Sequence, residues 1–517
     1  MAAASVTVFT TSAAGDKLVE AKQPALGPVT RASSGVIHVD VNSPRQTVVG
    51  FGSAFTESAA AVLAKLSAAK RGEVLNALFS KQGANYSLTR THIGSCDFSF
   101  GKYSYAEQES TTLADFSIGP DEDDLLPLIL DAKAASPDGF KIIASPWTAP
   151  PWMKTTGDWY EAPAASNGYH GTGGQLKPEH RATFALYLSK YVSAYAAKGV
   201  PIWAITPENE PLGNSGQWES LEFSAAGMNV FVRDFLGPRF ASDHPETKIL
   251  GFDQNREHAQ EWADALLGDA VTAPFVSGTA VHWYASTFKV YPEVLDAIHA
   301  KYPDKLLLNS EATIDALRDE AREMDPPGDS SVPWGKASGK LAYWKNDSWW
   351  WQPNASDWGY FWADGNPGTS AADQVDHPLY EPVYRYARDI IEGLNHWFVG
   401  WVDWNLALDQ LGGPNHVGNW AAAPVMIDTN AEDVYYTPLY YVMAHFSKLS
   451  RPGARVLKTT VSADLPLLAT STWDDAGRLT LHVLNTTSAP LSYTLVLANG
   501  SAQLQIGPAT LQSVVVQ

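Results

Sequence analysis

The stretch AITPENEP at residues 204–211 and the stretch LLLNSEA at residues 306–312 decide the fold of this chain. In each of them a short apolar run ends abruptly in a carboxylate. A continuous apolar run of this kind is typical of a strand buried on both faces, as in a parallel sheet. A carboxylate just past such a strand lies where α/β barrels hold their chemistry. Glu210 and Glu311 are therefore the first candidates for a catalytic pair.

Outward from these two stretches, eight apolar runs of strand length occur between residues 47 and 405. Amphipathic segments separate most of them, such as residues 58–79 and residues 178–198. The second of these segments begins with Pro178 and is followed by Gly199, which is typical of a helix. Strand and helix alternating eight times predict a (β/α)8 barrel, that is, a TIM barrel. An open doubly wound sheet also alternates, but it often carries a Gly-rich phosphate loop, and none is seen. The eight runs are residues 47–55, 86–93, 141–147, 201–206, 247–252, 279–284, 305–309 and 397–404.

The two ends of the chain have a different pattern. Short apolar runs with turns between them fill the last part, and residues 478–484 alternate with period two. The first part holds two more strand-like runs, at residues 5–12 and 35–41. We therefore predict one β-sandwich side domain, built from both termini and packed beside the barrel. The predicted division is residues 1–46 for its N-terminal strands, 47–450 for the barrel, and 451–517 for its C-terminal part.

Composition limits the class of protein. A chain of 517 residues can bury a large core, with one large domain and a smaller one. The formal net charge of −20 argues against nucleic acid as a partner. The 19 Trp and 21 Tyr residues fit a carbohydrate-binding protein, because sugar C–H faces stack on aromatic rings. A large aromatic core is the alternative explanation for any single one of these residues.

Cys96 is the single cysteine, so an intramolecular disulfide and a multi-cysteine metal site are excluded. No apolar run is long enough to span a membrane. The N-terminus lacks a basic segment followed by an apolar one, so a secretory signal is not predicted. We expect a cytoplasmic protein, or a secreted or periplasmic one whose signal has been removed. The sequence does not predict the number of subunits.

The connection between the seventh and eighth predicted strands, residues 314–380, is unusually long. It carries Trp349, Trp350 and Trp351, and a second aromatic run at residues 358–362. Long loops on the carboxyl side of a barrel commonly shape the active site. The alternative is a loop that packs on its own aromatic side chains.

Two carboxyl groups about 5 Å apart are what retaining glycoside hydrolysis needs, because one donates a proton and the other attacks the anomeric carbon. A salt-bridge or capping role is the alternative for a single Glu at a strand end. A metal hydrolase would need clustered ligands, whereas His282 stands alone among aromatic residues, and His396 and His416 fit hydrogen-bonded structure better than a ligand pair. Ser53 lacks the Gly-x-Ser-x-Gly elbow of a serine hydrolase. No metal and no cofactor are expected.

A set of further motifs follows in chain order: GFGSAFTE at 50–57, SCDFS at 95–99, ASPWTAPPWMK at 144–154, VHWY at 281–284, SEA at 310–312, GWVDWNLAL at 400–408 and GGPN at 412–415. Together with residues 209–211 and Glu311, these motifs resemble glycoside hydrolase family 30 of clan A, and most closely its glucosylceramidase branch. The resemblance covers residues from about 48 to 450. Two departures are the single cysteine without a signal and the longer Trp-rich segment after Glu311.

The resemblance implies a role for each matching position. Glu210 would be the acid/base and Glu311 the nucleophile. Asn209 would hydrogen-bond the sugar 2-hydroxyl, and Arg90 would keep the nucleophile ionised. Tyr284 would lie near the nucleophile, with Trp283 beside it. The positions implied to hold the terminal glucose are Asp97, Trp147, Trp404 and Asn419, with Asp97 taking two hydroxyls at a site expected to be open to solvent.

The function predicted from sequence is thus a retaining exo-β-glucosidase of glucosylceramidase type. Its substrate would be a β-glucoside, either glucosylceramide or a β-glucan oligosaccharide. A β-1,6-glucanase or a β-xylosidase on the same scaffold is the alternative within enzymes. A carbohydrate-binding protein without turnover is the alternative outside them.

Overall fold

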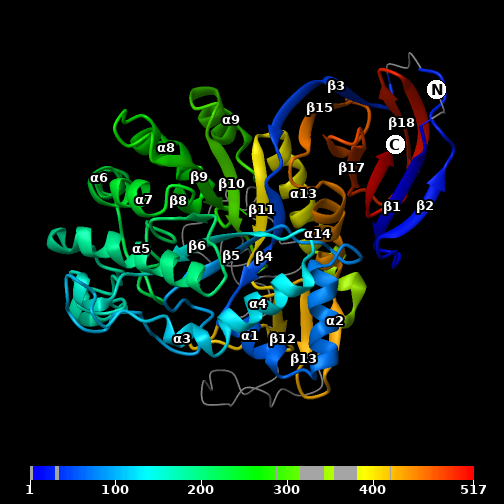
Figure 1. Cartoon of the computed structure of the whole chain (residues 1–517). Coiled ribbons are helices and arrows are strands. Elements are labelled where there is room, and N and C mark those ends of the chain that lie inside the picture. The colour runs from blue at the N-terminus through cyan, green and yellow to red at the C-terminus, as the bar shows by residue number, and fades with distance from the viewer. Residues whose placement is uncertain (1–3, 30–33, 287, 315–342, 354–380, 420) are drawn as a thin grey trace.

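A closed barrel of eight parallel strands forms the centre of the computed structural model, which describes residues 4–29, 34–286, 288–314, 343–353, 381–419 and 421–517. Helices surround the barrel (Figure 1). The predicted (β/α)8 architecture is confirmed. In chain order the strands are β4 (Gly50–Phe55), β5 (Leu88–Ile93), β6 (Lys141–Pro146), β7 (Ala204–Ile205), β8 (Lys248–Asn255), β9 (Val276–His282), β10 (Leu306–Glu311) and β11 (Phe398–Asp403), and the barrel closes as β10-β11-β4-β5-β6-β7-β8-β9.

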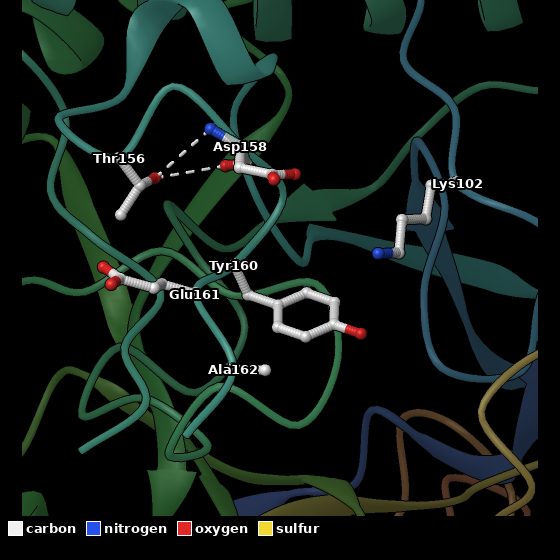
Figure 2. A pocket seen from close by; sticks show the side chains of 6 residues that line it. All are labelled: Lys102, Thr156, Asp158, Tyr160, Glu161 and Ala162. Carbon is white, nitrogen blue, oxygen red and sulfur yellow. Dashed lines mark hydrogen bonds between the residues drawn. The ribbon is translucent and has the colours of Figure 1, made fainter. Parts of the chain in front are cut away.

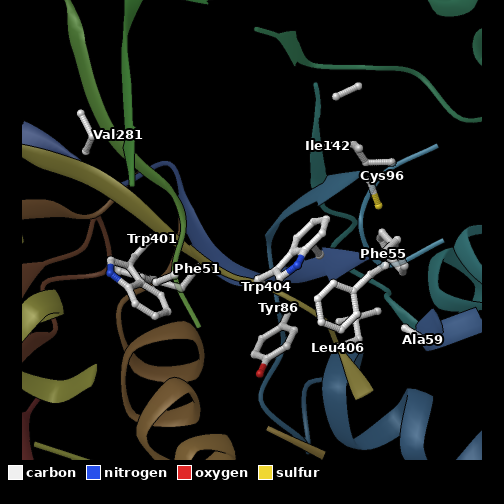
Figure 3. Packing of buried hydrophobic residues seen from close by; sticks show 14 of the residues in the cluster. Phe51, Phe55, Ala59, Tyr86, Cys96, Ile142, Val281, Trp401, Trp404 and Leu406 are labelled. Atoms are coloured by element: carbon white, nitrogen blue, oxygen red, sulfur yellow. The ribbon is translucent and has the colours of Figure 1, made fainter. Parts of the chain in front are cut away.

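The barrel strands are buried on both faces, as their continuous apolar runs predict. Every residue of β4, β5 and β11 is buried. Phe51 of β4 is the register partner of Trp401 of β11, and Figure 3 shows the two side chains together. A Cβ atom at Gly52 would collide with the carbonyl oxygen of Leu88, so the close approach of β4 and β5 requires a glycine there.

The helices around the barrel follow the predicted segments with one difference. Residues 58–79 form two helices, because α1 ends at Ala64 and α2 begins after Ser67. The hydroxyl of Thr56 caps α1 by accepting a hydrogen bond from the N–H of Ala59 at 3.1 Å. Gly199, at a φ of +80°, lies just after α5. The helices are α1 (Glu57–Ala64), α2 (Ala68–Phe79), α3 (Gly119–Glu122), α4 (Leu125–Ala135), α5 (Arg181–Ala197), α6 (Ala225–Phe231), α7 (Gly237–Asp243), α8 (Ala259–Leu267), α9 (Pro292–Lys301), α13 (Pro382–Asn395) and α14 (Pro438–Leu449). None of the helices in the described ranges has the length and apolarity needed to cross a membrane.

Strands from both termini form the side domain, in one nine-stranded sheet (Figure 1). All nine strands belong to one hydrogen-bonded sheet, whereas an ordinary β-sandwich consists of two separate sheets. Apolar residues from both halves of the sheet, such as Leu495 and Leu481, share one buried cluster, so the sheet packs on itself. The predicted boundaries at residues 46 and 450 stay a prediction. The strands are β1 (Val6–Ser12), β2 (Val19–Gln23), β3 (Val36–Thr47), β15 (Arg455–Val461), β16 (Leu468–Trp473), β17 (Leu479–Asn485), β18 (Leu491–Leu497), β19 (Gly500–Ile506) and β20 (Thr510–Val516), ordered β19-β18-β3-β15-β16-β17-β20-β1-β2.

The polar face of this sheet packs on the barrel helix α14. His445 of α14 hydrogen-bonds Ser513 at 2.7 Å and Thr11 at 2.9 Å. Ser450, just past α14, hydrogen-bonds His482 at 2.8 Å. The alternating run in β17 is therefore buried on both sides, because its polar residues face the helix and its apolar residues face the sheet's own core.

A small sheet follows β11 that the sequence analysis does not predict. It contains β12 (Ala407–Asp409), β13 (Val425–Asp428) and β14 (Asp433–Tyr436). The loop between β12 and β13 carries Asn419, one of the predicted sugar contacts.

Part of the Trp-rich connection lies within the described residues, at 343–353. Trp350 is buried and its Nε1 donates to the carbonyl oxygen of Trp344 at 3.0 Å. The ring of Trp351 packs edge-on against Tyr384 of α13. Trp344, Trp350 and Trp351 therefore all take part in packing contacts. The second aromatic run, at residues 358–362, lies outside the described residues.

Candidate active site

Glu210 and Glu311 lie together at one end of the barrel. Glu210 follows β7 and Glu311 is the last residue of β10, so both project from carboxyl ends of parallel strands. One carboxylate oxygen of each, together with a ring nitrogen of His282, forms a group whose atoms lie within 4.8 Å of one another. This separation matches the roughly 5 Å of retaining glycosidases and falls short of the roughly 6.5–9.5 Å of inverting ones.

The backbone after β7 directs Glu210 toward this meeting point. Glu210 has a φ of +51°, a left-handed conformation that is uncommon outside glycine. Its N–H donates to the carbonyl oxygen of Asp253 at 3.0 Å, and the N–H of Asn209 donates to that of Pro146 at 2.7 Å. These bonds to β8 and β6 compensate the strained turn and fix the direction of the carboxylate.

Two predicted neighbours hold the carboxylate of Glu311. Nη1 of Arg90 donates to its Oε2, and the hydroxyl of Tyr284 donates to its Oε1 at 2.9 Å. Burial raises the pKa of Glu311, while the positive charges of His282 and Arg90 pull that pKa down. Arg90 thus acts on the nucleophile candidate in the direction that the resemblance implies.

Asp253, at the carboxyl end of β8, is a central residue that the sequence analysis missed. It is fully buried, and its carboxylate has hydrogen-bond partners on five other barrel strands or at their ends. Burial would raise its pKa, but the charges of Arg90 and His282 hold the pKa well below the usual range. An apolar run ending in a carboxylate, the signal that found the other two residues, is present here as well, at residues 249–253. The donors are Arg90 Nη2 at 2.8 Å, Ser145 at 2.9 Å, Thr206 at 2.8 Å, Ser310 at 2.5 Å and a ring nitrogen of His282 at 3.0 Å.

His282 does not stand alone among aromatic residues, contrary to the interpretation of its sequence. Its Nδ1 lies 3.1 Å from Oε1 of Glu210, and its Nε2 lies 3.0 Å from Oδ1 of Asp253. Burial lowers the pKa of an imidazole, but the carboxylates of Glu311 and Asp253 outweigh it and raise the pKa of His282 to about 9. At neutral pH a charged imidazolium therefore links the acid/base candidate to the buried aspartate.

This linkage predicts a pH dependence of stability. Because the folded-state pKa of His282 exceeds its unfolded value of about 6.5, its contribution is complete below pH 6.5 and lost as the pH rises through 9. A pKa shift of this size corresponds to about 3 kcal/mol in the free energy of unfolding. We expect the free energy of unfolding of wild type to fall toward that of His282→Gln over this pH range in urea titrations. A gap between the two proteins that stays constant from pH 6 to pH 10 would contradict the assignment.

The predicted glucose contacts gather beside the carboxylates. Nδ2 of Asn419 donates to Oδ2 of Asp97 at 3.0 Å. The rings of Trp147 and Trp404 stack at 5.2 Å, and the guanidinium of Arg90 lies 4.8 Å from the ring of Trp147. Asp97 is only 7% exposed, so the expectation that it is open to solvent is wrong for this structure. Burial, with the nearby charge of Glu311, raises the pKa of Asp97 well above its usual value.

Two further predicted residues have different surroundings. Asn209 is at the site, where its Oδ1 accepts from Nη2 of Arg90 at 2.7 Å. Trp283 packs edge-on against Tyr386 of α13 and Trp401 of β11, and its Nε1 donates to the carbonyl oxygen of Thr313 at 3.1 Å. These contacts belong to the packing between barrel and helices, so a sugar contact by Trp283 stays a prediction that they do not support.

The group Glu210, His282 and Glu311 could in principle offer three ligand atoms to a metal ion. Arg90 already hydrogen-bonds the carboxylate of Glu311, and His282 is held in its charged form by its neighbours. A cation would have to displace both positive charges. The arrangement therefore suits proton transfer and nucleophilic attack better than metal binding.

Comparison with known proteins agrees with this geometry. A family model described as the glycosyl hydrolase family 30 TIM-barrel domain matches residues 48–324 and 357–450. The lysosomal acid glucosylceramidase of Mus musculus is 30% identical, over 87% of this chain and 77% of the relative. The putative glucosylceramidase 3 of Caenorhabditis elegans is 29% identical, over 93% and 81%. The endo-1,6-β-D-glucanase neg1 of Aspergillus fumigatus is 26% identical, over 99% and 94%.

Two solved structures match this chain over nearly its whole length. SrfJ from Salmonella typhimurium superposes with a TM-score of 0.80 at 26% identity, covering 99% of each chain. A solved endo-β1,6-glucanase superposes with a TM-score of 0.77 at 25% identity, again covering 99% of each chain.

Proposed function

This chain belongs to glycosyl hydrolase family 30, and from that premise we propose that it is a retaining exo-β-glucosidase of the glucosylceramidase type. The observation that carries the proposal is the approach of the Glu210 and Glu311 carboxylates to within 4.8 Å. The buried Asp97 and the half-buried Asn419 beside them support a terminal sugar as the group that is recognised.

The proposed reaction proceeds in two displacements. Glu311 attacks the anomeric carbon while Glu210 donates a proton to the leaving oxygen, which gives a glycosyl ester on Glu311. Glu210 then takes a proton from water, which hydrolyses the ester. Arg90, His282 and Tyr284 hold the two carboxylates in place, and the positive charges of the first two favour the ionised form of Glu311 before attack.

Hydrolysis of β-1,6-glucan is the second candidate. Its support is the similarity to proteins named as endo-1,6-β-glucanases, at identities close to those of the glucosylceramidases. The two candidates share the glucose unit and differ in what is attached to it.

A side-by-side substrate panel tests the proposal. Initial rates are measured on aryl β-glucoside, aryl β-xyloside, glucosylceramide and β-1,6-glucan, and NMR records the anomer of the first product. The proposal expects turnover of the aryl β-glucoside and glucosylceramide with β-glucose released first. Turnover confined to internal bonds of β-1,6-glucan would favour the second candidate, and initial α-glucose would contradict retention.

Asp97→Ala tests the glucose subsite. A carboxylate that accepts two sugar hydroxyls makes charge-assisted hydrogen bonds of about 1.5–3 kcal/mol each. We therefore expect kcat/KM on an aryl β-glucoside to fall by about two to four orders of magnitude. Because Asp97 is buried, the melting temperature is measured in parallel. Asp97→Asn keeps the shape of the side chain and one acceptor oxygen, so its kcat/KM should fall less than that of Asp97→Ala. Unchanged kinetics, or a loss explained entirely by unfolding, would assign Asp97 a structural role.

A further inference from the structure

A cavity of about 390 Å³ lies on loops at the catalytic end of the barrel and is lined by none of the residues of the carboxylate site. Figure 2 shows the ring of Tyr160 in the middle, with Lys102 to its right, Asp158 above and Glu161 to its left. Its volume is within the range of small-molecule sites. The lining residues are Lys102, Thr156, Asp158, Tyr160, Glu161 and Ala162.

Hydrogen bonds fix the walls of this cavity to each other. Lys102 is on the loop that follows β5, and the other lining residues are on the loop that follows β6. Nε1 of Trp152, on the second loop, donates to the carbonyl oxygen of Ala106, on the first, at 3.0 Å. Glu161 and Thr172 exchange two backbone hydrogen bonds at 2.8 and 2.9 Å, which close the second loop on itself. The cavity is therefore a built feature of the two loops.

A buried lysine connects the cavity to the catalytic motif. Nζ of Lys154 donates to the carbonyl oxygens of Trp159 at 2.5 Å and Ser220 at 2.9 Å, which fixes the residue next to Tyr160. The charge of Lys154 also acts on Glu208, two residues before Glu210. The cavity thus stands beside the loop that carries the proton donor.

The polar groups around the cavity select the kind of ligand. Nζ of Lys102 lies 4.2 Å from the ring centroid of Tyr160, and among the described residues no carboxylate lies within 4.0 Å of it. Asp158 and Glu161 add two negative charges to the same lining. An anion would meet these two carboxylates, and a cation would meet Lys102. A neutral ligand rich in hydroxyl groups can donate to the carboxylates, accept from Lys102 and contact the tyrosine ring.

We propose that this cavity is a saccharide subsite that binds a neutral sugar unit on the leaving-group side of the scissile bond. The proposal rests on the proposed β-glucosidase function and extends its substrate class to oligosaccharides. Tyr160 would be a specificity-determining residue that contacts a sugar beyond the terminal glucose, and Lys102 would hydrogen-bond the same unit.

The test compares Tyr160→Ala with the matched control Tyr169→Ala, since Tyr169 is on the same loop, is 73% exposed and does not line the cavity. On β-linked gluco-oligosaccharides of two to six units, Tyr160→Ala should lower kcat/KM roughly tenfold, as for loss of one aromatic contact. Both variants should keep wild-type kcat/KM on an aryl β-glucoside. Lys102→Gln provides a second, exposed variant with the same expected pattern.

Two results would overturn the proposal: equal loss on aryl glucoside and oligosaccharides, or no loss on either. Titration calorimetry with the same oligosaccharides and the same variants decides the matter independently of turnover. If wild type hydrolyses no β-glucoside, the proposed function fails, while oligosaccharide binding that Tyr160→Ala weakens and Tyr169→Ala does not would still support the subsite. Absence of binding, or equal binding by all variants, would show that the cavity does not bind saccharide and would overturn the proposal.

Discussion

Glu311→Gln is expected to lower kcat on an aryl β-glucoside by at least about four orders of magnitude, because an amide cannot form the glycosyl ester. The amide keeps the shape of the side chain and can still accept from Tyr284. It removes the negative charge that pairs with Arg90, so part of the cost falls on stability, and melting temperature is measured on the same preparations.

A matched control is Glu57→Gln. Glu57 also follows a barrel strand within two residues, but it lies in the first turn of α1, where it accepts from the N–H of Phe100 at 3.4 Å. This variant should stay within about threefold of wild-type activity, the range expected of a residue outside the chemistry. A fluorinated or epoxide glucose analogue should label wild type at Glu311 and leave Glu311→Gln unlabelled. Labelling at another carboxylate would remove the nucleophile assignment.

Glu210→Ala is expected to separate substrates by their leaving groups. General acid catalysis contributes about two to four orders of magnitude, and only poor leaving groups need it. Hydrolysis of an alkyl or lipid β-glucoside should therefore fall by about three orders of magnitude, while attack on an activated aryl glucoside by Glu311 should slow much less.

Azide supplies the control for this variant. The space left by the Glu210 side chain admits a small anion near the anomeric carbon, and the positive charge of His282 lies beside it. Azide should restore turnover of the aryl substrate in Glu210→Ala, with no effect on Glu311→Gln, and should give the β-glycosyl azide. An α-configured azide would show inversion and would exclude the double displacement.

The barrel and its carboxylate pair could be predicted because both are encoded locally. Most barrel strands are short, largely apolar runs, which is what burial on both faces favours, although β5 carries Arg90 and His92. Glu311 is the last residue of β10, and Glu210 follows the end of β7 closely. Asp253 has the same local pattern, yet its importance depends on charged groups that only barrel closure brings together. Arg90 comes from β5 and His282 from β9, and no spacing in the sequence shows that they meet at β8.

Neighbouring residues at the end of β9 show a second limit. Consecutive side chains of a strand point to opposite faces, so only one of His282 and Trp283 can face the carboxylates. In the structure it is His282, and Trp283 packs toward α13. Both faces of a barrel strand are buried, so hydrophobicity does not show which residue points inward. The small sheet of β12 to β14 was missed because its strands, three to four residues long, give too little alternation to detect.

The pairing of β1 with β20 sets an order for events during synthesis. Val6 lies opposite Val516, so one edge of β1 is covered by a strand that is synthesised long after it. The barrel strands between them pair with neighbours close in the chain, apart from the closing β11–β4 contact, and pairings of short separation form faster. β3, and the edge of β1 that β2 does not cover, must therefore wait for β15 to β20 to be synthesised, with apolar residues such as Val8 and Ile37 not yet packed. This interval is when a nascent chain of this topology is most exposed to aggregation and most dependent on chaperones.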